Sequence, residues 1–523
     1  MTRARTRAPF IRLSLTGLTA AAAALAVSAA PAMAHGGDHA DTEQMRAEFL
    51  AAPGDPALTS DNVSFLSAFP ETTGISGDFS VSSEHFYTSS LDTLTVFDIS
   101  DPKTPVIAGT LPNFVFENEA MNYGEQRTKS GELKSQFIMV GVDIVQAAPG
   151  DPEFNIGGGE LIIVDVSEPS TPTIVARVPG STSTHTVACV KRVKCNFAYS
   201  AGDSGRYSIF DLRDITKPKE VDANPNKEGV QGFRSPASAP SSVFSGGAGH
   251  KWNYVGKGLA FHTGSLGTAA FDVSKPLKPR LLTTTNDVAG TPEKATPWNN
   301  FIHHNSWLPH AFKYKSDAPA KLSNGNVLLV TEEDYENTDC ETAGSFQTWR
   351  VGNLRNPDAI TPLDKVELED LGGPEEGIFP QGGFCSAHWF DYHQTGIVAA
   401  AYYNGGTRLL DVRDPKNIKS FGFVAGGGQT WDAYWVPQRD ANKRALLSRT
   451  NIFYSVDAVR GLEVYEVTNL PGRRASQRAV GGQSAATKPT SAIDTDAGVF
   501  LPIGIVGAYV LTRIRRRRNA QTD

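Results

Sequence analysis

Several of the 11 histidines of this chain lie in short segments that mix imidazoles with apolar and aromatic residues. His185 lies in STHTVAC, His303 and His304 lie in NFIHHNSW, and His388 lies in SAHWFDYH. Imidazole nitrogens are common ligands of copper, zinc and iron. A fold that brought these four residues together would create a site for copper or another transition metal. The alternative is that each histidine fixes a turn or packs beside an aromatic residue.

The adjacent pair His303 and His304 limits such a site. Successive side chains of a strand point to opposite faces, so at most one of the two would face a shared centre. His262, in LAFHTG, is a further histidine in a strand-like context.

Two acidic segments are further candidates for binding or catalysis. The segment TEEDYENTDC includes the loop 332–339, and oxygen-rich loops can hold calcium, although a solvated loop is the favoured interpretation. Glu117 and Glu119, in FENEAMNYG, either face a channel or lie on the surface. Neither segment has the spacing of an EF-hand, and the sequence alone supports no Ser-His-Asp arrangement.

The four cysteines form two candidate disulfides. Cys189 and Cys195 flank VKRVK, which is typical of the tip of a hairpin. Cys340 and Cys385 are the remaining pair. A thiolate metal site is the alternative, but the chain has no CxxC spacing, and disulfides are typical of exported proteins.

The elements that would position these residues are indicated by a repeated phrase. An apolar run ends in an acidic residue, and a turn that usually contains proline follows a few positions later, as in LTVFDISDPKTP and LIIVDVSEPSTP. The full copies place an aspartate at this position, and two weaker copies place another residue there. The seven positions are Asp98, Asp165, Asp211, Asp272, Arg350, Asp411 and Glu466. Such an aspartate can accept backbone N–H bonds in the following turn, so we expect turn residues and not catalytic acids.

Seven such units predict an all-β fold, a seven-bladed β-propeller. Within each unit, β-branched and aromatic residues alternate between Gly, Pro, Asn and Asp, which is typical of short strands. A unit of that kind buries its apolar face only against its neighbours, so the units must close into a ring. The spacing between units, from 46 residues (Asp165 to Asp211) to 78 residues (Asp272 to Arg350), predicts long inter-strand insertions.

Both ends of the chain resemble targeting segments. Arginines, an apolar stretch and Ala32-Met33-Ala34 predict a secretory signal peptide, and an apolar segment followed by arginines predicts a C-terminal membrane anchor with its basic tail in the cytoplasm. We therefore expect a protein tethered to the extracytoplasmic face of the cell membrane. The expected organisation is a signal peptide (1–34), a lead-in (35–60), the propeller (61–472), a flexible linker (473–496), the transmembrane anchor (497–514) and the cytoplasmic tail (515–523).

The composition restricts the partners. The net charge of −7 is spread along the chain, so no nucleic acid is expected as a partner. A single closed ring predicts a monomer.

The repeated segments resemble a known repeat family. LIIVDVSEPSTPTIVARV and TRLLDVRDPKNIKSFGF are similar to the LVIVD repeat of bacterial and archaeal exported proteins. This resemblance implies a β-propeller but no particular activity. In general plan the chain is also similar to the selenium-binding protein and methanethiol oxidase propellers, and that resemblance implies a histidine-rich copper site.

Two functions follow from these observations. The favoured function is a cell-surface module, not an enzyme, that binds an extracellular protein or a cell-wall glycan. Aromatic residues on its loops would make the contacts, and the candidates are Trp252, Trp298, Trp307, Trp431 and Trp435, unless these residues pack as wedges between blades. The other function is a copper-dependent oxidoreductase acting on a small molecule such as a thiol.

Overall fold

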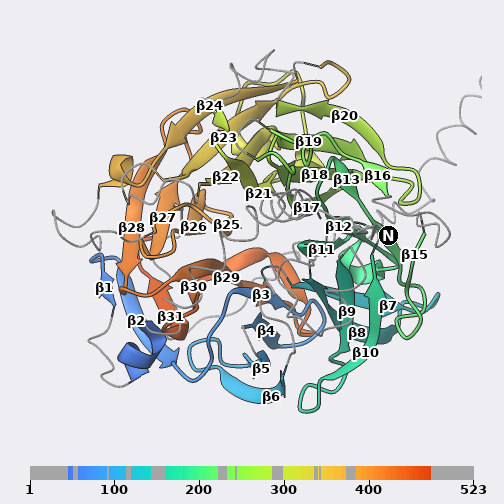
Figure 1. The fold of residues 1–523 in the computed structure, drawn as a ribbon. Helices are drawn as coiled ribbons and strands as arrows, with labels where there is room; N and C mark the ends of the chain where they lie inside the picture. Colours follow the sequence, from blue (N-terminus) through green and yellow to red (C-terminus); the bar gives the residue numbers. More distant parts are fainter. Residues whose placement is uncertain are drawn as a thin grey trace, which may run out of the picture.

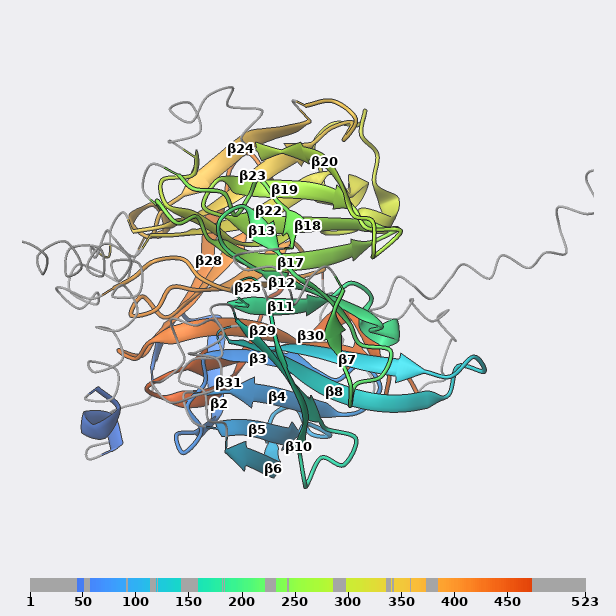
Figure 2. The ribbon, with the colours of Figure 1, turned by 45° about the vertical axis from the view of Figure 1, so that its right-hand side comes forward.

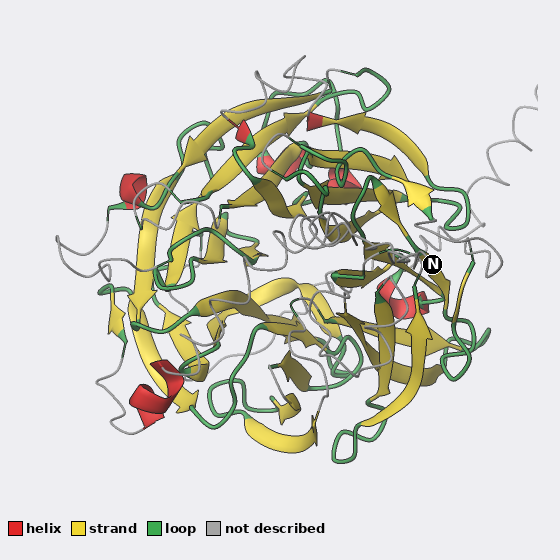
Figure 3. Ribbon diagram, viewed as in Figure 1, coloured by secondary structure: helices red, strands yellow, loops and turns green. Residues whose placement is uncertain are grey.

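The computed structural model describes residues 45–50 and 57–472. Gaps within this range fall at 91–92, 113–118, 120, 143–158, 181, 183, 222–231, 242–243, 286–297, 335–339, 341–342, 358 and 373–383. The regular secondary structure of the described chain is mainly antiparallel strands, with a short helix over 45–50 and a few single-turn helices (Figure 3). The segments predicted to be a signal peptide, a linker, a membrane anchor and a cytoplasmic tail, and most of the predicted lead-in, lie outside the described residues. Within them, no helix is long and apolar enough to cross a membrane.

Seven antiparallel sheets of four or five strands form a ring of blades, and each blade begins at its inner strand. Blade 1 contains β3 (Ser76–Phe79), β4 (His85–Ser89), β5 (Thr93–Asp98) and β6 (Val106–Pro112). Blade 2 contains β7 (Asn122–Arg127), β8 (Leu133–Val142), β9 (Glu160–Asp165) and β10 (Thr173–Pro179). Blade 3 contains β11 (Thr186–Cys189), β12 (Phe197–Ala201), β14 (Ile209–Asp211) and β15 (Lys219–Glu220). Beside blade 3, β13 (Arg206–Tyr207) pairs with β16 (Phe233–Arg234).

The remaining blades repeat this order. Blade 4 contains β17 (Gly249–Gly256), β18 (Leu259–Gly264), β19 (Gly267–Asp272) and β20 (Arg280–Thr284). Blade 5 contains β21 (Ile302–Trp307), β22 (Val327–Glu333), β23 (Ser345–Val351) and β24 (Ile360–Val366). Blade 6 contains β25 (Phe390–His393), β26 (Ile397–Ala401), β27 (Thr407–Asp411) and β28 (Lys419–Ala425), and β1 (Leu58–Thr59) extends it at the outer edge. Blade 7 contains β29 (Thr430–Arg439), β30 (Ala445–Asp457), β31 (Gly461–Val467) and, outermost, β2 (Val63–Phe69).

The last blade closes the ring with strands from both ends of the described chain. Val63 of β2 pairs with Val467 of β31, so the N-terminal part supplies the outer strand of the final sheet. In Figure 1 the inner strands β17, β21, β25 and β29 lie near the centre, and β6, β10, β20, β24 and β28 lie at the periphery. The turned view shows β17 to β20 of one blade lying one above another (Figure 2). The predicted seven-bladed propeller is confirmed.

The core lies mainly between neighbouring blades. One hydrophobic cluster joins Tyr87 and Val96 of blade 1 to Tyr123, Ile138 and Val140 of blade 2, and all five are buried. Each blade therefore buries its apolar faces against its neighbours, as closure of the ring requires.

The repeated aspartates end the third strand of their blades and shape the next turn. In all five, Oδ1 accepts the backbone N–H of the residue two positions later, at distances of 2.8 to 3.1 Å. In blade 2, for example, Ser167 donates its N–H to Asp165 across 2.8 Å. These residues are turn residues, as their sequence context predicts.

Both predicted disulfides are present. Cys189 is bonded to Cys195 with a Cα–Cα distance of 5.4 Å, and Cys340 is bonded to Cys385 with a Cα–Cα distance of 4.6 Å. The first lies within blade 3, between the end of β11 and the single-turn helix η2 (Arg192–Lys194). The second links the β22–β23 connection of blade 5 to the segment that leads into blade 6. Two disulfides are typical of proteins outside the reducing cytosol.

Candidate metal centre

Four histidines reach the axis of the ring from four consecutive blades. His185 directly precedes β11, His250 lies in β17, His304 lies in β21 and His388 precedes β25. Their rings pack in chain order, with centroid distances of 4.7 Å from His185 to His250, 4.3 Å from His250 to His304 and 4.0 Å from His304 to His388. Because the inner strands of a propeller begin around the same channel, residues far apart in the sequence become neighbours here.

Two buried glutamates complete this group. Glu119 lies ahead of β7 in blade 2, and Glu333 is the last residue of β22 in blade 5. Both side chains have no exposed surface. We call the group of Glu119, Glu333 and the four histidines the axial cluster.

Three of the histidines present Nε2 to the carboxylate of Glu119. The distance to Oε1 is 2.7 Å from His304 and 3.3 Å from His388, and His185 contacts Oε2. His250 approaches Oε1 through Nδ1 at 3.6 Å. Ligands of a four-coordinate ion with bonds of about 2.0–2.2 Å lie roughly 3.3–3.6 Å apart. The separations of His388 and His250 from Glu119 fall in this range, whereas His304 and His185 lie at hydrogen-bonding distance from it.

Glu333 lies near three of the same histidines. Its carboxylate oxygens lie 3.9 Å from His250 Nε2, 3.7 Å from His304 Nε2 and 3.8 Å from His388 Nε2. The hydroxyl of Tyr403 donates to Glu333 Oε1 across 2.5 Å and orients the carboxylate. Three groups of three residues could each hold an ion, because one ligand atom from each residue lies within 4.8 Å of the other two. The groups are Glu119, His304 and His388; Glu119, His185 and His250; and His250, His304 and Glu333.

The nitrogens of the cluster are suited to metal binding. His388 Nδ1 lies 2.6 Å from the carbonyl oxygen of Trp431, so the Nδ1–H donates there and Nε2 keeps its lone pair. Among the described residues, no hydrogen-bond partner is found for His388 Nε2, His250 Nδ1 or His304 Nδ1. A hydrogen bond from the second ring nitrogen to a carbonyl is how proteins usually orient a metal-binding imidazole.

Without a metal, the carboxylate of Glu119 requires nearby positive charge that the buried imidazoles do not readily supply. Burial raises the pKa of Glu119, but His185 and His250 hold it well below its usual range. Burial and the neighbouring His304 in turn hold the pKa of His250 well below its usual value, and burial lowers the pKa of His304 to about 3. The carboxylate is therefore stable only beside positive charge, while the imidazoles resist protonation. A divalent cation would satisfy both requirements.

His303, one of the four predicted ligands, is not part of the cluster. Its Nδ1 lies 2.9 Å from Thr268 Oγ1 and its Nε2 lies 2.7 Å from the carbonyl oxygen of Trp298. Successive side chains of β21 point to opposite faces, so His303 packs within the blade while His304 reaches the axis. The structure thus brings together His185, His304 and His388 of the predicted set.

Other candidates from the sequence have structural roles. The His262 ring stacks on Trp252 with the centroids 4.3 Å apart, and its Nδ1 lies 2.6 Å from Ser235 Oγ. Trp252, Trp431 and Trp435 are buried wedges and not exposed contact residues.

The predicted calcium loop is divided between two places. Glu332 is buried and accepts a 2.7 Å hydrogen bond from Ser345 Oγ, whereas Glu333 belongs to the axial cluster. Both residues belong to the end of β22 and not to a loop. Their side chains point to opposite faces of the strand, so the two carboxylates lie in different surroundings. Residues 335–339 lie outside the described residues.

The sequence also left members of the cluster unidentified. His250, in GHKWNYV, was not selected, although it begins the inner strand of blade 4 much as His185 precedes that of blade 3. For Glu119 the sequence leaves a channel-facing and a surface position equally open, and for Glu333 it favours a solvated loop. The signal for His250 is its position in the blade, because the other three histidines of the axial cluster also lie at or near the start of an inner strand.

A model of the LVIVD repeat matches residues 73–111 and 156–179. The chain contains LVIVD repeats. The first match covers blade 1 and the second covers the two outer strands of blade 2. The repeat and the propeller together support an interaction module of the propeller type. The more distant likeness to the selenium-binding proteins is not shown, and no curated protein matches the chain significantly.

Solved structures similar to this chain include two propeller domains. The β-propeller domain of Cps50 (Swd1) from Myceliophteria thermophila has 11% identity and a TM-score of 0.46, with 78% of this chain and 100% of that chain covered. The WD40 β-propeller domain of Doa1 has 6% identity and a TM-score of 0.43, with 78% and 99% covered. The propeller assignment for this chain rests on the sheet order and ring closure described above.

Proposed function

We propose that this protein is an exported β-propeller that holds one transition metal ion at the axis of its ring and presents it to a small ligand in the channel. The observation that carries this proposal is the convergence of four histidines from four blades on the buried carboxylate of Glu119. A buried set of this size and composition has a large desolvation cost without a cation. The two disulfides support export.

The donor set favours a borderline metal. Imidazole suits copper, zinc, iron and nickel, and carboxylates tolerate all of them. Among divalent ions, a site of nitrogen and oxygen donors generally binds Cu²⁺ most tightly. Copper is therefore the first metal to test, with zinc as the comparison.

The propeller would then act as an interaction module for a small molecule. The four histidines and Glu119 would bind the ion, Glu333 would supply further negative charge, and Tyr403 and the Trp431 carbonyl would orient the ligands. Binding of an extracellular protein or a cell-wall glycan, the membrane anchor and the oxidation of a thiol stay predictions of the sequence.

Metal analysis of the full-length chain, purified without a histidine tag, tests this proposal. We expect about one transition metal ion per chain after incubation with Cu²⁺ or Zn²⁺ and removal of free ions. His304→Gln should lower the affinity at least tenfold, because it removes a nitrogen that faces both glutamates.

His303→Gln is the matched control. It replaces the adjacent residue of the same type, which is equally buried but points away from the axis. Circular dichroism of both variants confirms folding. A folded wild-type protein that retains neither metal would refute the metal centre, as would equal metal affinities in the two variants.

A further inference from the structure

A small cavity with a mixed polar and aromatic lining lies next to the axial cluster. Its volume is about 190 Å³. Three of the residues that line it directly follow cluster histidines in the chain: Lys251 after His250, Asn305 after His304, and Trp389 after His388. We call this cavity the inner chamber.

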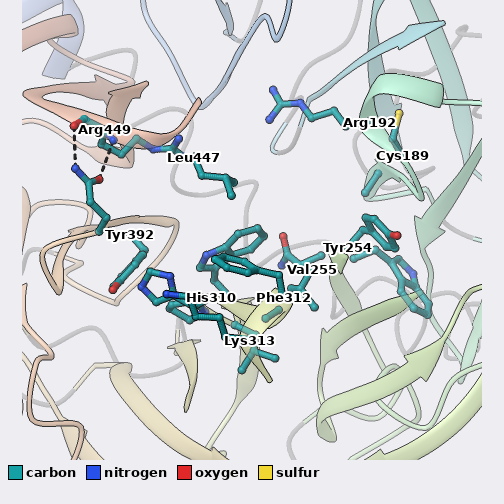
Figure 4. A pocket seen from close by; sticks show the side chains of 18 of the residues that line it. Cys189, Arg192, Tyr254, Val255, His310, Phe312, Lys313, Tyr392, Leu447 and Arg449 are labelled. Atoms are coloured by element: carbon teal, nitrogen blue, oxygen red, sulfur yellow. Dashed lines mark hydrogen bonds between the residues drawn. The ribbon is translucent and has the colours of Figure 1, made fainter. Parts of the chain in front are cut away.

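A wider pocket of about 430 Å³ continues from the inner chamber. The two cavities share Asn122, Arg192, Asn253, Trp307, Tyr392, Leu447 and Arg449 in their linings. In Figure 4, His310, Phe312 and Lys313 lie on one side of the wider pocket, with Arg192 and Leu447 across the opening. Much of this lining is aromatic or aliphatic, and Phe312 is 40% exposed. We call this pocket the outer pocket.

Trp389 separates the inner chamber from the axial cluster. Its ring lies 4.3 Å from that of His304, and the ammonium nitrogen of Lys251 lies 4.6 Å from its centroid. The Trp389 side chain is buried, and no hydrogen-bond partner for its Nε1 is found in the described part of the chain. A buried donor without a partner costs free energy unless a ligand supplies an acceptor.

Two of the three basic side chains that line the inner chamber form ion pairs, whereas Lys251 forms none among the described residues. Arg192 is paired with Asp78, and Arg449 is paired with Asp391 at 3.1 Å. Within the described residues, no carboxylate forms an ion pair with Lys251. Asp432 also lines the inner chamber and accepts the N–H of Ala433 across 2.7 Å, but among the described residues it forms no ion pair with Lys251.

We propose that the inner chamber binds the carboxylate of a small aromatic acid, with Lys251 as its counter-ion and the outer pocket around its ring. An ammonium without an ion pair can bind one carboxylate, whereas a phosphate monoester carries nearly twice that charge. The combined pocket has the aromatic walls and the few polar groups of a ligand site. The inference rests on the proposed function in that the bound acid would face the metal centre across Trp389.

Calorimetric titration of the full-length, metal-loaded protein with phenylacetate tests this inference. We expect binding of one molecule per chain, with affinity at least tenfold weaker in Lys251→Met and unchanged metal content. Lys278→Met, which removes an exposed lysine of the same blade, is the matched control and should bind as the wild type does.

Two further arms use the wild-type protein, so the test does not depend on the folding of a variant. The neutral analogue 2-phenylethanol and the dianion phenyl phosphate should both bind at least tenfold more weakly than phenylacetate. Absence of phenylacetate binding, equal binding of 2-phenylethanol, or equal affinity in Lys251→Met would each overturn the inference.

Metal analysis of the same samples separates this inference from the proposed function. A metal-free wild-type protein that still binds phenylacetate through Lys251 would refute the metal centre but support the inner chamber. A metal-loaded protein that does not bind phenylacetate would refute the chamber and leave the metal centre in place.

Discussion

The axis and the rim of this propeller use repeated positions in opposite ways. At the rim, five aspartates occupy the same place in five blades, and each accepts a backbone N–H within its own turn. At the axis, four blades contribute one histidine each, and the four side chains form a single cluster. The aspartates at the rim therefore make separate contacts, one in each blade. A histidine at the axis meets its partners only when the ring is closed.

This difference between the rim and the axis predicts how far the effect of a substitution extends through the protein. A change at the rim removes one local hydrogen bond. A change that displaces an inner strand disturbs ligands supplied by several blades, because the cluster has no element of its own.

Removal of the Cys340–Cys385 disulfide should have the largest effect. The bond spans 45 residues and ends three residues before His388. In the chain-entropy model, a loop of that length contributes about 4 kcal/mol to the free energy of unfolding, against about 2 kcal/mol for the six-residue span of Cys189–Cys195. We expect the double alanine variant at 340 and 385 to lose about 4 kcal/mol in urea unfolding and to bind metal more weakly.

The double alanine variant at 189 and 195 is the comparison. It should lose about half as much stability, because the loop that it opens is shorter. Equal losses in the two variants, or tight metal binding without the longer bridge, would show that the segment leading to His388 is held by packing alone.

Acid should destabilise the protein in part through a histidine away from the axis. Burial lowers the pKa of His262 from 6.5 to about 3. Between these values the unfolded chain binds the proton more readily than the folded chain, so stability is complete above about pH 6.5 and falls as the pH decreases. The slope amounts to at most about 1.4 kcal/mol per pH unit.

The variant His262→Gln should therefore show a smaller loss of stability between pH 6.5 and pH 4 than the wild type. Urea unfolding at several pH values measures this slope. The difference should be the same with and without bound metal, since His262 is not in the axial cluster. A slope that His262→Gln leaves unchanged would contradict this assignment.

The sequence predicts the ring of seven blades, but it identifies only part of the axial cluster. The phrase around Asp165 and its copies predicts strands, turns and their number, because each of these is determined by neighbouring residues. His304 and His388 were identified as candidates, but His250 was not, and His303 was included although the pleat turns it away. Which residue faces the axis depends on the register of each inner strand. That register is fixed by packing between blades, which a local pattern does not report.

A single aspartate at the rim should give the smallest effect. Asp165 accepts one backbone N–H, from Ser167, and no ion pair of Asp165 is found among the described residues. Asp165→Ala should cost about 1 kcal/mol in urea unfolding, the usual value for one such hydrogen bond, and should leave the metal content unchanged. Asp165→Asn is the matched control, because the amide oxygen can accept the same bond and little stability should be lost. If Asp165→Ala released the metal, the turns of the rim would be coupled to the axis, and the contrast between the two regions would be wrong.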